Sequence, residues 1–95
     1  MRVSFHRFAE QELIAAARYL EVERHLGAAF LDEYKAWERQ VLEFPQSCPE
    51  IAPTIRGGYL SRFKFHVTYQ VRGEVIRILY LRHARQAPLR EWKRI

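Results

Sequence analysis

The spacing of apolar residues predicts a short strand followed by two helices in the first half of the chain. Residues 2–6 alternate between polar and apolar side chains, which indicates a strand. Further along, apolar residues follow one face of a helix: Ala9, Leu13, Ala16, Ala17 and Leu20. A second helical stripe occupies residues 28–44: Phe30, Tyr34, Trp37, Val41 and Phe44. Gly27 is predicted to end the first helix in a left-handed conformation, so that the two helices form an antiparallel hairpin.

The second half of the chain has the two-residue period of strands. Residues 59–71 alternate strictly, which predicts one half-buried antiparallel strand, bent or broken near Lys64. The side predicted to face the helices holds Tyr59, Ser61, Phe63, Phe65, Val67, Tyr69 and Val71. A tight hairpin at Gly57 and Gly58 is predicted to join this strand to one at about 53–56, and Gly73 marks the next reversal. Residues 75–81 are nearly all apolar, which indicates a central strand covered on both faces.

Together these elements predict a single α+β domain over residues 1–95. A helical hairpin covers one face of a small, mainly antiparallel sheet, and Pro88 opens a short C-terminal helix. The element order is β-α-α-β-β-β with that final helix. We expect the first strand to lie beside the strand at 75–81, because a central strand needs neighbours on both edges. Tyr69 and Trp37 are then core residues, and Trp92 packs the final helix onto the sheet.

Charge divides the chain into two unequal halves. The 95 residues carry a formal net charge of +5. Residues 1–50 hold six basic and nine acidic side chains, whereas residues 51–95 hold ten basic and two acidic ones. A basic half of this kind indicates an acidic or polyanionic partner, with a plain solvated surface as the alternative. The predicted strand places Arg62, Lys64, His66 and Arg72 together on the sheet face away from the helices.

Composition excludes several classes of protein. Hydrophobic residues make up 48% of the chain, which argues against intrinsic disorder. The single cysteine, Cys48, cannot form an internal disulfide or a cysteine-based zinc site. Neither a membrane-spanning run nor a secretory signal is recognisable, so the expected location is the cytoplasm. His6 and His25 lack the spacing of metal ligands, and we expect neither a metal nor a cofactor.

Three sequence motifs, in this order and spacing, resemble the RelE/ParE superfamily of toxins, and the resemblance covers essentially the whole chain. The motifs are Gly27-Ala-Ala-Phe30-Leu31-Asp-Glu33 with Phe44-Pro45, Leu60-x-Arg62-Phe63-x-Phe65-x-Val67-x-Tyr69, and His83-x-x-x-x-Pro88-x-x-x-Trp92. The resemblance implies a growth-inhibiting toxin of a type II toxin–antitoxin system, of the kind associated with plasmid stabilisation. It also implies neutralisation by a small antitoxin protein. RelE-like members cut mRNA in the ribosome, whereas ParE-like members inhibit DNA gyrase.

The residues favour the ParE-like branch and leave the RelE-like branch as the alternative. RNA cleavage in this superfamily needs no metal: one group takes the proton of the 2′-OH, another protonates the leaving oxygen, and cations stabilise the phosphate. The candidate catalytic residues, if the chain is a ribonuclease, are His66, His83 and Arg85. His66 stands where many RelE-like members have an arginine, three residues before Tyr69. Trp92 stands in place of a terminal tyrosine, and an indole is no general acid or base.

The resemblance also implies which surface meets the partners. Arg62, Lys64, Arg72 and Arg82 are the candidates for a basic face that binds either the target or the antitoxin. We expect the antitoxin to carry an acidic C-terminal segment and to form a hetero-oligomer with this chain. The target is DNA gyrase, or the ribosome with its mRNA, and no membrane is involved. A plain nucleic-acid-binding module is the remaining possibility, but the sequence has no helix-turn-helix or RNA-recognition strand motif.

Overall fold

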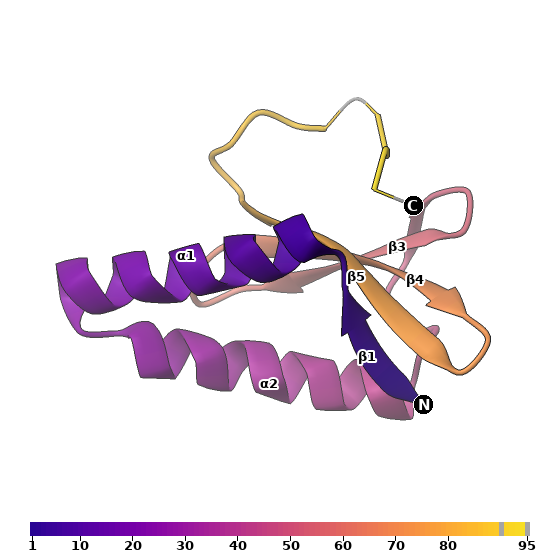
Figure 1. The fold of residues 1–95 in the computed structure, drawn as a ribbon, viewed down its shortest axis with the longest axis horizontal. Coiled ribbons are helices and arrows are strands. Elements are labelled where there is room, and N and C mark those ends of the chain that lie inside the picture. Colours follow the sequence, from indigo (N-terminus) through magenta and orange to yellow (C-terminus); the bar gives the residue numbers. More distant parts are fainter. Residues whose placement is uncertain (90, 95) are drawn as a thin grey trace.

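Two helices cover one face of a five-stranded sheet in the computed structural model, which describes residues 1–89 and 91–94 (Figure 1). The elements are β1 (Arg2–Phe5), α1 (Arg7–Arg24), α2 (Gly27–Glu43), β2 (Glu50–Ala52), β3 (Ile55–Leu60), β4 (Phe65–Arg72) and β5 (Val75–His83). The strand order is β1-β5-β4-β3-β2. The predicted two-layer α+β class is therefore confirmed. Within the described residues, no helix is long and apolar enough to cross a membrane.

Strand β5 has a neighbour on each side, as its apolar sequence predicted. β1 runs parallel to it with Val3 opposite Ile76, and β4 runs antiparallel to it along its other edge. β1 is shorter than β5, and the His6 backbone N–H donates to the Ile78 carbonyl at 2.8 Å as the pairing ends. Beyond Ile78, the outer edge of β5 is therefore open to groups other than a strand.

The two helices begin and end within two residues of the predicted bounds, but their junction differs. His6 caps α1, because its Nδ1 atom accepts from the Phe8 backbone N–H at 3.2 Å. Burial and the nearby arginines, first among them Arg94, lower the pKa of His6, which favours the neutral ring that this bond requires. The left-handed residue at the end of α1 is His25, with φ 56°, and not Gly27 as predicted.

Gly27 is instead the first residue of α2, and its role is close packing. A Cβ atom at this position would lie 2.8 Å from the Ala17 carbonyl oxygen and 2.9 Å from Cβ of Glu21. Both distances are shorter than real Cβ contacts, so only glycine lets α2 begin directly against α1. The prediction failed because a glycine near a helix end serves either backbone conformation or contact distance, and the sequence does not distinguish them.

The main core lies between the helices and the sheet. Phe30, Tyr34 and Val41 of α2 pack against Leu60, Val67 and Tyr69 of the sheet, each less than 5% exposed. The predicted core positions of Tyr69 and Trp37 are confirmed, and their rings meet edge-on with centroids 5.7 Å apart. The Tyr69 hydroxyl donates to the Pro45 carbonyl at 2.8 Å, which ties the loop after α2 to the sheet.

Residues 59–71 are broken near Lys64, as the prediction allowed, but the break is a full chain reversal and not a bend within one strand. They fold as the end of β3, a turn over residues 61–64, and most of β4, with Lys64 at φ 62°. Leu60 pairs with Phe65, and Tyr59 pairs with His66. Paired residues of neighbouring strands point to the same face of the sheet, so odd-numbered residues of β3 share a face with even-numbered residues of β4. Tyr59 consequently lies on the face away from the helices. Phe63 and Phe65 do pack toward the helices, against the Phe30 ring.

Of the two chain reversals predicted at glycines, the one at Gly57 and Gly58 is wrong and the one at Gly73 is confirmed. Gly57 and Gly58 lie inside β3, paired with Thr68 and Val67, and the turn before β3 falls at Pro53 and Thr54. The predicted reversal at Gly73 is confirmed, with a φ of 56° that suits glycine. The strictly alternating pattern of residues 59–71 hid the further reversal over residues 61–64, because the apolar period continues across it.

The predicted C-terminal helix is absent from residues 84–89 and 91–94, and Arg90 and Ile95 lie outside the described residues. After β5 the chain returns across the uncovered face of the sheet toward β3 (Figure 1). We call the described part of this stretch, residues 84–89 and 91–94, the tail. Leu89 and Trp92 of the tail pack on a second small core made by Ile55, Leu79 and Tyr80. Trp92 therefore does pack onto the sheet, but from an extended segment.

Candidate functional site

The four arginine and lysine residues assigned to a basic face do not share one surface. Arg62 and Lys64 lie in the turn between β3 and β4, whereas Arg72 lies at the other end of β4. Arg72 lies eight positions after Lys64, at the end of β4, about 26 Å away at ~3.3 Å per residue. The prediction of one continuous basic strand face is therefore wrong, because it depended on residues 59–71 being a single strand.

Arg62 and Arg72 are each engaged locally. The Arg62 backbone N–H donates to Glu33 Oε2 at 3.0 Å, and its guanidinium lies 5.0 Å from the centroid of the Phe63 ring. Arg72 Nε donates to Gln70 Oε1 at 2.8 Å. Arg62 and Arg72 therefore make their contacts at opposite ends of β4. The binding roles proposed for them stay predictions.

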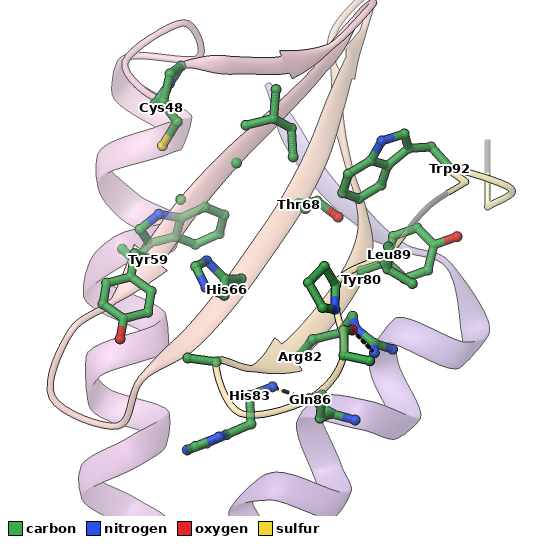
Figure 2. A pocket seen from close by; sticks show the side chains of 18 of the residues that line it. Cys48, Tyr59, His66, Thr68, Tyr80, Arg82, His83, Gln86, Leu89 and Trp92 are labelled. Atoms are coloured by element: carbon green, nitrogen blue, oxygen red, sulfur yellow. Dashed lines mark hydrogen bonds between the residues drawn. The ribbon is translucent and has the colours of Figure 1, made fainter.

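A row of three polar side chains crosses the face of the sheet that the helices leave uncovered. His66 of β4 pairs with Tyr59 of β3 on one side and with Arg82 of β5 on the other. The Tyr59 and His66 rings lie 4.8 Å apart at an angle of 38° (Figure 2). Arg82 donates to the Ala87 carbonyl at 2.8 Å and so holds the start of the tail. We call Tyr59, His66 and Arg82 the polar row.

His83 and Arg85 do not join this row. The His83 ring packs edge-on against Phe65, with centroids 5.1 Å apart, and its side chain points away from the His66 and Tyr59 rings (Figure 2). Its Nδ1 atom accepts from the Arg85 backbone N–H at 3.0 Å. The three candidate catalytic residues are therefore brought near one end of the sheet but not around a common point.

A cavity of about 600 Å³ lies between the uncovered sheet face and the tail (Figure 2). Its sheet side is formed by the polar row with Gly57, Thr68 and Tyr80, and its tail side by Pro88, Leu89 and Trp92. Trp37, Cys48 and Ile51 close the end nearest to β2. Among the described residues that border it there is no aspartate or glutamate. The cavity is thus mainly apolar, with a cationic and imidazole rim.

Two polar atoms of the residues that border this cavity are buried without a hydrogen-bond partner in the described structure. One is the Thr68 hydroxyl oxygen, on a residue that is 5% exposed, and the other is the Trp37 indole nitrogen. The Trp37 ring lies directly against Gly58, whose missing side chain makes room for it. Buried polar groups normally have partners, so such atoms often mark a place that a ligand or water fills.

The far end of the tail is fixed to the sheet edge that β1 leaves open. Arg94 forms a two-pronged ion pair with Glu12 of α1, at 2.6 and 3.1 Å, and also donates to the Leu79 carbonyl. Glu12 in turn accepts from the Leu81 backbone N–H at 3.2 Å. The Tyr80 hydroxyl accepts from the Lys93 backbone N–H at 3.1 Å. These bonds satisfy the open edge of β5 and anchor the tail at both of its ends.

Sequence reasoning missed Tyr59 and Tyr80 as residues of this face, and it gave Thr68, which its alternating pattern placed there, no functional role. Tyr59 was assigned to the helix side, but the pairing Tyr59–His66 places it on the other one. Thr68 and Tyr80 face each other across β4 and β5, and no sequence motif marks them. Among the described residues, no group of three or more histidine, cysteine, aspartate or glutamate side chains is placed to hold a metal ion.

Comparisons with known proteins give one informative likeness. No protein-family model matches the sequence, and no curated protein has significant sequence similarity to it. A solved chain titled "Chromosomal ParDE TA system from P. aeruginosa" is 24% identical, with a TM-score of 0.63 over 87% of this chain and 95% of that chain. Helices, sheet and nearly the full length of both chains take part in this match. The protein therefore has the fold of a chain from a ParDE toxin–antitoxin system, in agreement with the resemblance seen in its sequence.

Proposed function

We propose that this protein is the toxin of a type II toxin–antitoxin system, that an antitoxin neutralises it in the cytoplasm, and that it inhibits DNA gyrase as ParE-like toxins do. The observation that carries the proposal is the structural likeness to the ParDE chain over nearly the whole length of both proteins. The three sequence motifs add to it, because they place the same superfamily pattern on the helical hairpin and on β3, β4 and the end of β5.

The placement of the candidate catalytic residues favours gyrase inhibition over RNA cleavage. Metal-independent cleavage needs a base, an acid and a cation around one phosphate, within hydrogen-bond reach of it. His66 lies on the uncovered sheet face, whereas the His83 ring packs on Phe65. Arg82 is the cation beside His66, but it already donates to the Ala87 carbonyl. The three candidate catalytic residues of the sequence, His66, His83 and Arg85, therefore do not form an acid–base pair around one phosphate.

RNA cleavage is the second candidate, and the polar row is the observation that favours it. His66 supplies an imidazole, the side chain that most often serves as a general base, and Arg82 can stabilise a phosphate. The exposed phenol of Tyr59, whose ring packs on that of His66, can donate a proton. The sequence had not indicated this role for Tyr59. On this candidate the row itself is the catalytic site, and His83 and Arg85 are not part of it.

Purified protein separates the two candidates. We expect it to inhibit supercoiling by DNA gyrase and to leave mRNA intact in a translation reaction, while its expression in cells induces a DNA-damage response. His66→Gln should then lower toxicity no more than His83→Gln, since neither acts as a proton carrier. New mRNA ends within minutes of induction, abolished by His66→Gln but not by His83→Gln, would establish RNA cleavage instead.

The antitoxin expectation has its own test. The basic half of the chain predicts a partner whose C-terminal half is acidic and whose binding weakens as salt rises. Co-expression of the neighbouring short reading frame should restore growth and yield a stable hetero-oligomer. A partner with a basic C-terminal half would contradict the electrostatic argument. Because Arg62 and Arg72 lie at opposite ends of β4, their Glu variants should be tested singly to find which end the partner occupies.

A further inference from the structure

The cavity beneath the tail has the size and wall chemistry of a small-molecule site. Its volume of about 600 Å³ lies inside the usual range of roughly 300–1,000 Å³ for ligand pockets. Single aromatic side chains of a partner would leave most of that space empty. The tail crosses the sheet without filling the space below it, so the cavity is present in the chain by itself.

The walls of the cavity are built mainly from aromatic rings. The stacked Tyr59 and His66 rings border one end, with their centroids 4.8 Å apart. Tyr80 and Trp92, which meet edge-on at 5.7 Å, border the side toward the tail. Gly57 contributes no side chain to the floor between them. A flat ring can stack on such surfaces, whereas a branched or bulky aliphatic molecule would forgo most of that contact.

The polar groups of the cavity indicate one anionic substituent. Arg82 and His66 stand side by side on neighbouring strands, and the described lining residues include no carboxylate. Among the described residues, one guanidinium nitrogen of Arg82 has a partner, the Ala87 carbonyl. The Arg82 guanidinium has five N–H donors in all, so others can reach an anion. The unpartnered Thr68 hydroxyl lies two residues from His66 along β4, about 7 Å away.

We propose that this cavity binds a flat aromatic molecule that carries one anionic group. The ring packs against the aromatic side chains that border the cavity, the anion lies against Arg82 and His66, and a polar ring atom bonds the Thr68 hydroxyl. The distance between the rim and Thr68 suits a molecule of about two fused rings. Aromatic carboxylates and free nucleoside monophosphates share this chemistry. The proposal goes beyond the proposed function, because inhibition of DNA gyrase assigns no role to this cavity.

Isothermal titration with defined probes tests it. We expect 2-naphthoate to bind at a ratio of one per chain, and 2-naphthamide, which has the same ring but no charge, to bind at least tenfold more weakly. Adenosine 5′-monophosphate identifies the source: tighter binding than 2-naphthoate assigns the site to nucleotides, and weaker binding assigns it to aromatic carboxylates. The proposal is overturned if neither anion binds, or if the neutral amide binds as tightly as 2-naphthoate.

Two variants and one control locate the site. Thr68→Val keeps the shape of the side chain and removes the unpartnered hydroxyl. Binding of quinoline-6-carboxylate, which has a ring nitrogen where 2-naphthoate has carbon, should therefore weaken severalfold, while 2-naphthoate binding and the melting temperature do not fall. Arg82→Gln should weaken 2-naphthoate binding tenfold or more and leave the amide unchanged. Arg24→Gln on the exposed end of α1 makes the same change of charge away from the cavity and should have no effect. Unchanged affinity for quinoline-6-carboxylate in Thr68→Val, together with unchanged affinity for 2-naphthoate in Arg82→Gln, would show that the anions bind elsewhere.

Discussion

Two adjacent glycines of β3 allow a sharp test of how the sheet and helices pack. In Gly58→Ala, the added methyl group would lie 2.8 and 2.9 Å from Cε2 and Cζ2 of Trp37, and closer still to its indole nitrogen. Carbon atoms in contact are normally about 3.5–4.0 Å apart, so the overlap is on the order of 1 Å. The indole cannot turn aside freely, because Tyr34 and Tyr69 pack on it with centroids 5.8 and 5.7 Å away.

The expected cost of Gly58→Ala is about 2–3 kcal/mol, toward the upper end of what overpacking of a core costs. For a domain of this size that corresponds to a fall in melting temperature of roughly 10–20 °C. Urea unfolding followed by tryptophan fluorescence measures it. The midpoint should fall while the slope of the free energy of unfolding with urea stays the same, since the surface exposed on unfolding hardly changes.

Gly57→Ala is the matched control, with the same chemical change one residue away on the opposite face. Its methyl group would lie 3.1 and 3.2 Å from two carbons of the Ile51 side chain. That side chain is 46% exposed and can move, so we expect a change within about 0.5 kcal/mol. Equal losses in the two variants would refute the packing argument, and so would a neutral Gly58→Ala.

Three further predictions concern the bonds that hold the tail and the loop after α2. Arg94→Met should lower the free energy of unfolding in urea by about 1–2 kcal/mol, because it leaves Glu12 without its cation. The side chains of Arg94 and Glu12 are only 21% and 26% exposed. An unchanged free energy of unfolding would mean that the tail is not held there. Tyr69→Phe should cost about 1 kcal/mol, the worth of its bond to Pro45, with the core otherwise unchanged. Burial, with a lesser contribution from Cys48, raises the pKa of Tyr69 to about 12, so the folded protein keeps this proton while the unfolded chain loses it near pH 10. Stability should therefore fall as pH rises from about 10 to 12, and the fall should be smaller in Tyr69→Phe when unfolding is measured across that range.

The sequence determined the elements and their layers, because apolar periodicity depends only on which side of an element is buried. The helices fall within two residues of their predicted bounds, and the apolar run at 75–81 is the strand with a neighbour on each edge. The placement of β1 beside β5 followed from the need to pair both edges of that strand. Sequence motifs also indicated the superfamily whose fold the structural likeness bears out.

The same reasoning located only part of the candidate site. His66 and Arg82 were singled out from their residue types, and the structure pairs them across β4 and β5. Tyr59 was assigned to the wrong face, and Thr68 was not singled out at all. A hydroxyl becomes notable only when its surroundings are known, since the sequence does not reveal whether a buried threonine has a partner.

Tertiary structure alone decided which side chains meet on the uncovered sheet face. A period of two continues unbroken through a four-residue turn, so the pattern at 59–71 fits one long strand as well as the hairpin that forms. The hairpin exchanges odd and even positions between its strands, and this brings Tyr59 to His66 while it separates Arg62 from Arg72. The tail likewise forms no helix, because a short segment gains little from helical bonds alone and Trp92 and Arg94 gain more by packing across β5. Local preference sets the elements, but pairing over long distances in the chain sets the site.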